Sequence, residues 1–90
     1  NFITYQYRDK LVFVTPASDY EQALDIAQKE FPKLVKFPRD RIIFNVFVLN
    51  RESNSRQSIR ISPEAWTATI DNASPGQVVS IDILPTPSKK

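Results

Sequence analysis

The sequence predicts a single small α+β domain in which one main helix packs on a mixed β-sheet. Three observations carry this prediction. The 90 residues are 41% hydrophobic and 24% charged, which is enough apolar material for one core in a globular domain. Short apolar and alternating segments separated by polar breaks are typical of strands. One longer segment instead repeats its apolar residues at helical spacing, directly after a helix start signal.

The chain opens with a predicted β-hairpin. Phe2–Tyr7 alternates and is rich in aromatic and β-branched residues, and Leu11–Val14 resumes the pattern. The polar residues between them, Arg8–Lys10, form a three-residue connection, although no glycine is present to define the turn type.

The main helix is predicted to follow a capping box that begins at Ser18. In that motif the Ser18 side chain accepts from the Glu21 amide, and Glu21 reaches back to the Ser18 amide. Pro32 ends the helix because it lacks an amide hydrogen and clashes with the preceding turn. One face collects the apolar residues Tyr20, Ala23, Leu24, Ala27 and Phe31.

The second half is predicted to contain three strands and a short helix. After the main helix, Leu34, Val35 and Phe37 are expected to pack beneath an irregular connection. A short helix follows with Ser62 as cap and Pro63 in its first position. The remaining elements are the strand Ile42–Leu49, a polar turn Arg51–Ser55, the strand Gln57–Ile61, a Pro-Gly turn Ser74–Gln77 and the strand Val78–Leu84. We assign residues 1–84 to the domain and expect 85–90 to be a disordered tail.

This order of elements, ββαββ(short α)β, is that of the β-grasp, or ubiquitin-like, fold. The second half resembles the end of ubiquitin-like domains found in large fungal proteins. There, a strand leads into a proline and a tryptophan on a short helix, then a Pro/Gly turn and a final alternating strand. The residues that carry the resemblance are Ile59, Ile61, Pro63, Trp66, Ile70, Pro75, Gly76, Val79, Ile81, Ile83 and Pro85, together with the opening run Phe2–Val14 and Pro16.

Phox/Bem1 and Ras-association domains are similar in topology. The acidic type of Phox/Bem1 domain carries clustered carboxylates, whereas only Glu64, Asp71 and Asp82 lie in the corresponding region here. A basic-type Phox/Bem1 domain, or a Ras-association domain docking on an acidic switch region, would use basic residues of the first hairpin. Arg8 and Lys10 are available for that role.

Composition argues against an enzyme. The chain has no cysteine and no histidine, so the commonest nucleophile, general base and metal ligand are missing. Its single glycine, Gly76, rules out a glycine-rich phosphate loop. The carboxylates Asp19, Glu21 and Asp25 are explained by the helix dipole, which favours acidic residues at a helix start. We therefore expect no catalytic site, no metal and no cofactor.

The net charge of +2 is too small to indicate a nucleic-acid footprint by itself. A loose basic run over Lys33–Arg41 leaves weak nucleic-acid binding as an alternative, although a solvated connection is the more common reading. The absence of cysteine and of any signal segment favours an intracellular location and predicts no membrane insertion. The first residue, Asn1, suggests a piece of a larger protein.

The leading candidate site is the outer face of the predicted sheet. Side chains of a strand alternate, so if Phe44 faces the helix, then Ile43, Asn45, Phe47 and Leu49 face away. An apolar outer face can mark an interaction surface, or it can be covered by another segment. We select Ile43, Phe47 and Arg60 as the candidate partner-binding residues, with Arg8 and Lys10 on the first hairpin as a second candidate.

The function predicted from the sequence is therefore a non-catalytic protein–protein interaction module, an adaptor or scaffold domain, of a larger protein. Oligomerisation or small-GTPase binding of the Phox/Bem1 or Ras-association kind is the alternative. Self-association through sheet edges remains open. The chain does not end in Gly-Gly, so conjugation to other proteins is not expected. Trp66 is expected to fill the core rather than a binding site.

Overall fold

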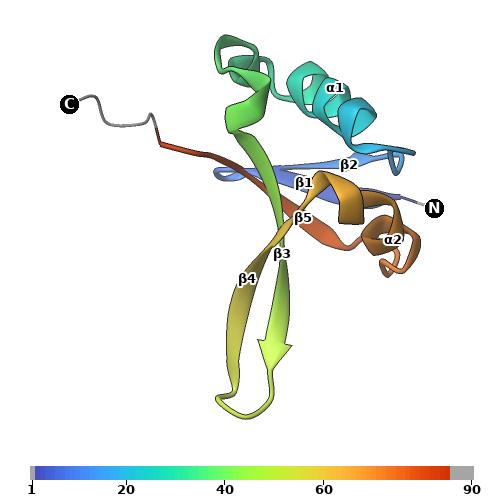
Figure 1. Ribbon diagram of the computed structural model, residues 1–90, viewed down its shortest axis with the longest axis vertical. Coiled ribbons are helices and arrows are strands. Elements are labelled where there is room, and N and C mark those ends of the chain that lie inside the picture. The colour runs from blue at the N-terminus through green and yellow to red at the C-terminus, as the bar shows by residue number, and fades with distance from the viewer. Residues whose placement is uncertain (1, 86–90) are drawn as a thin grey trace.

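The computed structural model describes residues 2–85 as a five-stranded mixed sheet with one main helix over it (Figure 1). The spatial order of the strands is β2-β1-β5-β3-β4, with β1 parallel to β5 and the other pairs antiparallel. This is the β-grasp topology that the order of elements predicts. The elements are β1 (Ile3–Tyr7), β2 (Lys10–Val14), α1 (Tyr20–Glu30), two 3₁₀ turns (Pro32–Lys36 and Arg39–Arg41), β3 (Ile42–Asn50), β4 (Ser55–Ile61), a 3₁₀ turn (Pro63–Ala65), α2 (Trp66–Asp71) and β5 (Val78–Ile83).

The first hairpin is tighter than the sequence predicts. Tyr7 pairs with Lys10, so the connection has two residues, Arg8 and Asp9, and Lys10 already belongs to β2. The missing glycine is replaced by Arg8, whose φ of 57° lies in the left-handed region that tight hairpin turns require.

The main helix begins one residue later than predicted. Asp19 rather than Ser18 is the N-cap, and its side chain accepts from the Gln22 amide at 2.8 Å. The Gln22 side chain reaches back to accept from the Ser18 amide at 2.7 Å. The N-cap is therefore shifted by one position, the return bond goes to the residue before it, and Glu21 is left to pair with Arg39 at 3.0 Å. The helix ends before Pro32 as predicted.

A single core lies between the sheet, α1 and α2. Trp66 fills its centre, fully buried, as predicted, and its indole Nε1 donates to the Ala17 carbonyl at 3.2 Å. Its ring lies 5.0 Å from that of Phe44 and 5.9 Å from that of Tyr20. Leu34 is buried beneath the connection as expected, but Val35 is not: 64% of its surface is exposed, because the 3₁₀ turn points it away from the core.

The Pro-Gly turn before β5 is confirmed. Gln77 donates to the Ser74 carbonyl at 2.9 Å, and Gly76 has a φ of 79°, the value that a type II turn requires at its third residue. Gly76 also donates to the Phe2 carbonyl at 2.9 Å, which ties the turn to the start of β1. The expected disordered tail falls mainly on residues 86–90, which lie outside the described residues.

Candidate functional site

The distal half of the β3–β4 hairpin extends away from the rest of the domain (Figure 1). β3 pairs with β5 over residues 42–45 and with β4 from Phe44 onward, so beyond Asn45 its single partner in the described part of the chain is β4. We call residues 46–59, which include this two-stranded ribbon and its turn, the arm. The antiparallel register continues to the pair Asn50 and Ser55, so the arm is regular backbone rather than a loop.

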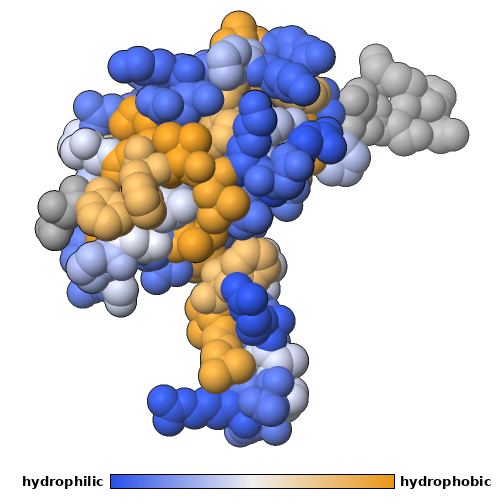
Figure 2. All heavy atoms as spheres, turned by 180° about the vertical axis from the view of Figure 1, so that it is seen from behind, coloured by the Kyte–Doolittle hydropathy of each residue, from blue (hydrophilic) through white to orange (hydrophobic). Residues whose placement is uncertain are grey.

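The arm exposes large apolar side chains on both of its faces. Phe47 and Leu49 point to one side, and Val48 and Ile59 to the other, because strand residues alternate. Their exposed fractions are 38% for Phe47, 57% for Leu49, 45% for Val48 and 45% for Ile59. A two-stranded ribbon has no layer with which to bury either face. Figure 2 shows the apolar side chains running down the arm beside charged ones.

The outer sheet face near the body differs from the prediction. Ile43 is only 9% exposed and Asn45 only 6%, since both lie on the part of β3 that pairs with β5. The apolar outer set therefore reaches solvent only from Phe47 outward. At this point Phe47 lines a hollow of about 380 Å³ together with Gln6, Arg8, Tyr7, Ser80, Ile81, Asp82 and Ile83.

The structure brings Phe47 and Arg8 together in this hollow and leaves Ile43, Arg60 and Lys10 outside it. Phe47 and Arg8 share the outer-face hollow, although they come from opposite sides of β5 in the sheet. Arg60 is exposed but lines a different hollow, at the α1 side of the β4 edge, with Tyr20 and Arg39. The guanidinium that lies over Phe47 belongs instead to Arg56, at 4.9 Å from the ring centroid. Sequence reasoning missed Arg56, although its position across from Leu49 follows from the hairpin register.

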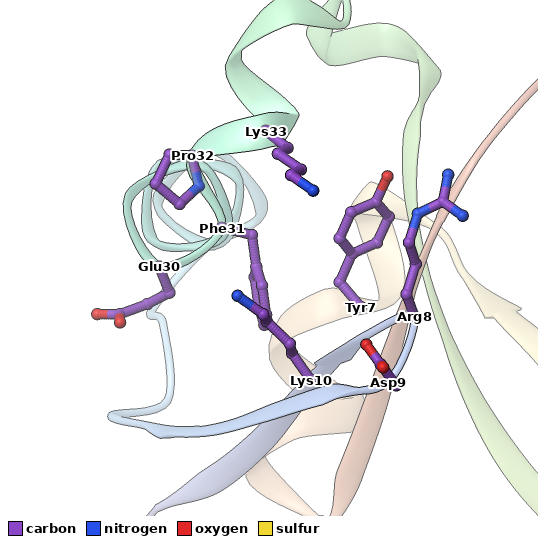
Figure 3. Close-up of a pocket in the computed structure, with 8 residues that line it drawn as sticks. All are labelled: Tyr7, Arg8, Asp9, Lys10, Glu30, Phe31, Pro32 and Lys33. Atoms are coloured by element: carbon purple, nitrogen blue, oxygen red, sulfur yellow. The ribbon is translucent and has the colours of Figure 1, made fainter.

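A second hollow, of about 290 Å³, lies between the tip of the first hairpin and the end of α1 (Figure 3). Its apolar wall is formed by Tyr7 and Phe31, whose rings meet edge to face at 5.9 Å. The basic residues Arg8, Lys10 and Lys33 surround these rings, and the acidic residues Asp9 and Glu30 lie at the margins. The arrangement suits a ligand that carries both an apolar group and a negative charge.

The basic run after the helix is partly neutralised within the molecule. The Arg39 guanidinium pairs with Glu21 at 3.0 Å and with Asp25 at 2.9 Å, and these contacts raise the pKa of Arg39. Arg41 donates to the Leu84 carbonyl at 2.8 Å and lies over the Phe37 ring. These contacts occupy two of the four cations in the basic run Lys33–Arg41, on which the nucleic-acid alternative depends.

Among residues 2–85 no group of three or more potential metal-ligating side chains comes together. No helix in that range is long and apolar enough to cross a membrane. Comparison of the chain with protein-family models, with curated proteins and with solved structures finds no match in any of the three. The class to which the structure assigns this chain is therefore that of the fold, an α+β domain of β-grasp topology.

Proposed function

We propose that this β-grasp domain is a non-catalytic protein-interaction module of a larger intracellular protein, and that it binds its partner through the arm. One observation carries the proposal: four large apolar side chains, Phe47, Val48, Leu49 and Ile59, are exposed on a regular hairpin that the domain itself does not cover. Contiguous exposed apolar surface on a soluble domain marks interaction sites. Aromatic and arginine side chains, here Phe47 and Arg56, are enriched where such interfaces concentrate their binding energy.

The polar surroundings support the same reading. Arg51, Glu52 and Arg56 lie beside the apolar stripe on the arm, and Ser80 and Asp82 lie beside Phe47 in the outer-face hollow. An apolar centre with a polar rim is the usual anatomy of a protein interface. Of the outer face predicted from the sequence, Phe47 belongs to the proposed surface, and Arg8 lies across the hollow from it. Ile43, which is nearly buried, and Arg60, which lines a different hollow, are not part of the proposed surface.

The experiment is affinity capture from nuclease-treated extract, with the native chain compared with a Phe47→Asp, Leu49→Asp variant. The control is Val35→Asp, which places one aspartate on an apolar residue exposed elsewhere in the domain. We expect the native chain and the control to retain a common partner that the arm variant loses. Emission from the buried Trp66 verifies that all three are folded. Retention of the same partner by the arm variant would reject the arm as the site.

A second candidate function rests on the hollow at the first hairpin. Three basic residues around an apolar wall suit an acidic protein surface, as the resemblance to Ras-association and basic-type Phox/Bem1 domains implies for Arg8 and Lys10. Binding at this site would weaken steeply with salt, because it depends on exposed charges. A Lys10→Glu, Lys33→Glu variant that loses the partner, while the arm variant keeps it, would favour this candidate. The apolar pattern of the second half further supports placing the chain among ubiquitin-like domains of large fungal proteins.

A further inference from the structure

The backbone of β2 has an unpaired edge. Among residues 2–85, β2 and β4 are the two outermost strands of the sheet, and β2 pairs only with β1. Since Tyr7 and Lys10 close a two-residue turn, they form a hydrogen-bonded pair, and such pairs then alternate along the antiparallel ladder. Val12 therefore bonds to Tyr5, while Leu11 and Phe13 direct their backbone N–H and C=O groups away from β1.

The side chains on this edge are unusually apolar. Leu11 is 57% exposed and Phe13 is 69% exposed, the largest fraction of any large apolar residue in residues 2–85. Phe2, itself 43% exposed, packs edge to face on Phe13 with ring centroids 4.7 Å apart. Proteins usually protect an edge with proline, with charges or with a covering segment. β2 contains no proline, and its one charged residue, Lys10, stands at its end.

The sequence of β2 is complementary to itself in the antiparallel direction. A twofold axis through Val12 places Leu11 of one copy across from Phe13 of the other, and these are the residues with free backbone groups. Each such pair exchanges two hydrogen bonds. Lys10 then lies across from Val14, so no like charges face each other. Val12, which is half-buried on the opposite face, meets its own symmetry mate.

The other edge of the sheet lacks this property. The register that pairs the whole of β4, Ser55–Ile61, with itself has its axis at Ser58 and places Arg56 across from Arg60 on both sides. Like charges directly opposite each other are destabilising in a sheet. The two edges therefore differ: β4 is protected against self-pairing by its arginines, and β2 is not.

From this contrast we propose that two copies of the chain associate through β2, edge to edge and antiparallel, to form one continuous sheet. The occupant of the β2 edge is a second copy because the free backbone groups, the apolar side chains and the charges all match in a single symmetric register. A twofold contact of this kind closes on itself, as in most homodimers. The arm lies at the opposite edge of the sheet and stays free for the proposed partner.

The test introduces charged residues of either sign on β2. Dimerisation of the full chain is then measured by sedimentation over micromolar to millimolar concentrations. The native chain is expected to be in a concentration-dependent monomer–dimer equilibrium. A Leu11→Lys, Phe13→Lys variant and a Leu11→Glu, Phe13→Glu variant each place like charges opposite each other, and each is expected to dimerise at least about tenfold more weakly. Mixed together they are expected to form a heterodimer, because lysines then face glutamates.

A matched control and a register test complete the experiment. A Phe47→Lys, Leu49→Lys variant carries the same charges on the arm and is expected to dimerise as the native chain does. Val12→Cys is expected to form a disulfide-linked dimer under mild oxidation, since the symmetric pair brings the two Cα atoms within disulfide range. The chain has no other cysteine. A native chain that is monomeric at every concentration, or charge variants that do not recombine, would overturn the proposal.

Discussion

The two hairpins of this domain are built alike and placed differently. Each joins two antiparallel strands, and each has a turn residue with positive φ that is not glycine: Arg8 at 57° in the first and Asn54 at 54° in the second. The first hairpin lies across the core along its whole length, with Ile3, Tyr5 and Val14 buried. The second is buried only near its base and continues as the arm. The same local structure is thus structural in one place and available for binding in the other.

This difference separates stability from binding. Side chains over the core stabilise the fold through the apolar surface they remove from water, whereas those on the arm are exposed whether or not the domain is folded. Proteins open locally with free energies that range from almost zero at such projections to the global value in the core. Changes to the arm should therefore alter binding with little effect on folding, and changes to the buried side chains of the first hairpin should do the reverse.

The largest difference in the free energy of unfolding is expected within β3, between a residue at its base and a residue on the arm. Phe44→Ala removes a fully buried ring that packs on Tyr5, Tyr20 and Trp66, and should lower the free energy of unfolding by about 3–5 kcal/mol. Leu49→Ala, on the arm, should change it by less than about 0.5 kcal/mol. Urea denaturation followed by Trp66 fluorescence measures both. Similar losses for the two variants would mean that the arm folds as part of the core.

The two turns offer a matched test of the comparison. Arg8→Val forces a β-branched residue into positive φ and should cost about 1–2 kcal/mol of global stability, because β1 and β2 cannot open without disrupting the core. Asn54→Val imposes the same strain, but the end of the arm can open locally, so the global free energy should barely change. Arg8→Asn is the control, since it removes the cation over Tyr7 while tolerating the conformation. Equal global costs for the two valine variants would contradict the comparison.

The first hairpin is packed tightly enough that the Tyr5 hydroxyl is buried without a hydrogen-bond partner. Tyr5→Phe should therefore raise the free energy of unfolding by about 1 kcal/mol at neutral pH. Tyr20→Phe is the matched control, because the Tyr20 hydroxyl donates to the Ile42 carbonyl at 3.4 Å and its loss should be slightly destabilising. A loss of stability in Tyr5→Phe would show that the hydroxyl has a partner in solution.

The same residue predicts a response to alkaline pH. Burial raises the pKa of Tyr5 above the ordinary tyrosine value of 10.0. As the pH rises, the Tyr5 hydroxyl therefore loses its proton in the unfolded chain before it does so in the folded one. The contribution of Tyr5 to the free energy of unfolding is complete below about pH 10 and declines above it, by up to about 1.4 kcal/mol per pH unit. Denaturation curves recorded between about pH 8 and 11, around the ordinary pKa of tyrosine, give the free energy of unfolding at each pH. This free energy should decline less steeply with rising pH in Tyr5→Phe than in the native chain.

The smallest change in the free energy of unfolding is expected for a substitution on the arm. Arg56→Ala removes the guanidinium from above Phe47 and should change the free energy of unfolding by no more than about 0.5 kcal/mol, since cation–π contacts at exposed sites are weak. Its effect on capture of the partner should be larger than its effect on stability. Thermal and urea denaturation, run beside the capture assay, measure the two quantities on one preparation.

Most of the fold follows from local signals in the sequence. The order of elements, the end of α1 before Pro32, the role of Ser62 as a cap and the turn at Gly76 all depend on residues within a few positions of each other. Errors in the elements are confined to their boundaries, and the packing of Val35 was also predicted wrongly. The helix cap moved by one residue because the Asp19 side chain accepts from the Gln22 amide, while the Gln22 side chain accepts from the Ser18 amide.

The candidate site was only partly predictable, for a different reason. Strand alternation correctly places Ile43, Asn45 and Phe47 on one face, but it says nothing about what lies beside them. Ile43 and Asn45 have β5 as a neighbour and are nearly buried, whereas Phe47 lies beyond the last β5 pair and is exposed. Likewise, Arg60 lies on the same strand as Arg56, yet only Arg56 reaches the Phe47 ring.

The sequence by itself therefore determined the class of fold, the order of the strands along the chain and which residues share a face, because these depend on short-range periodicity and turn chemistry. The tertiary structure alone decided which of those faces meet solvent. Exposure depends on where neighbouring strands stop: β5 ends its pairing with β3 at Asn45, and β2 has no neighbour beyond β1. The arm and the β2 edge are both consequences of those endpoints, which no local pattern records.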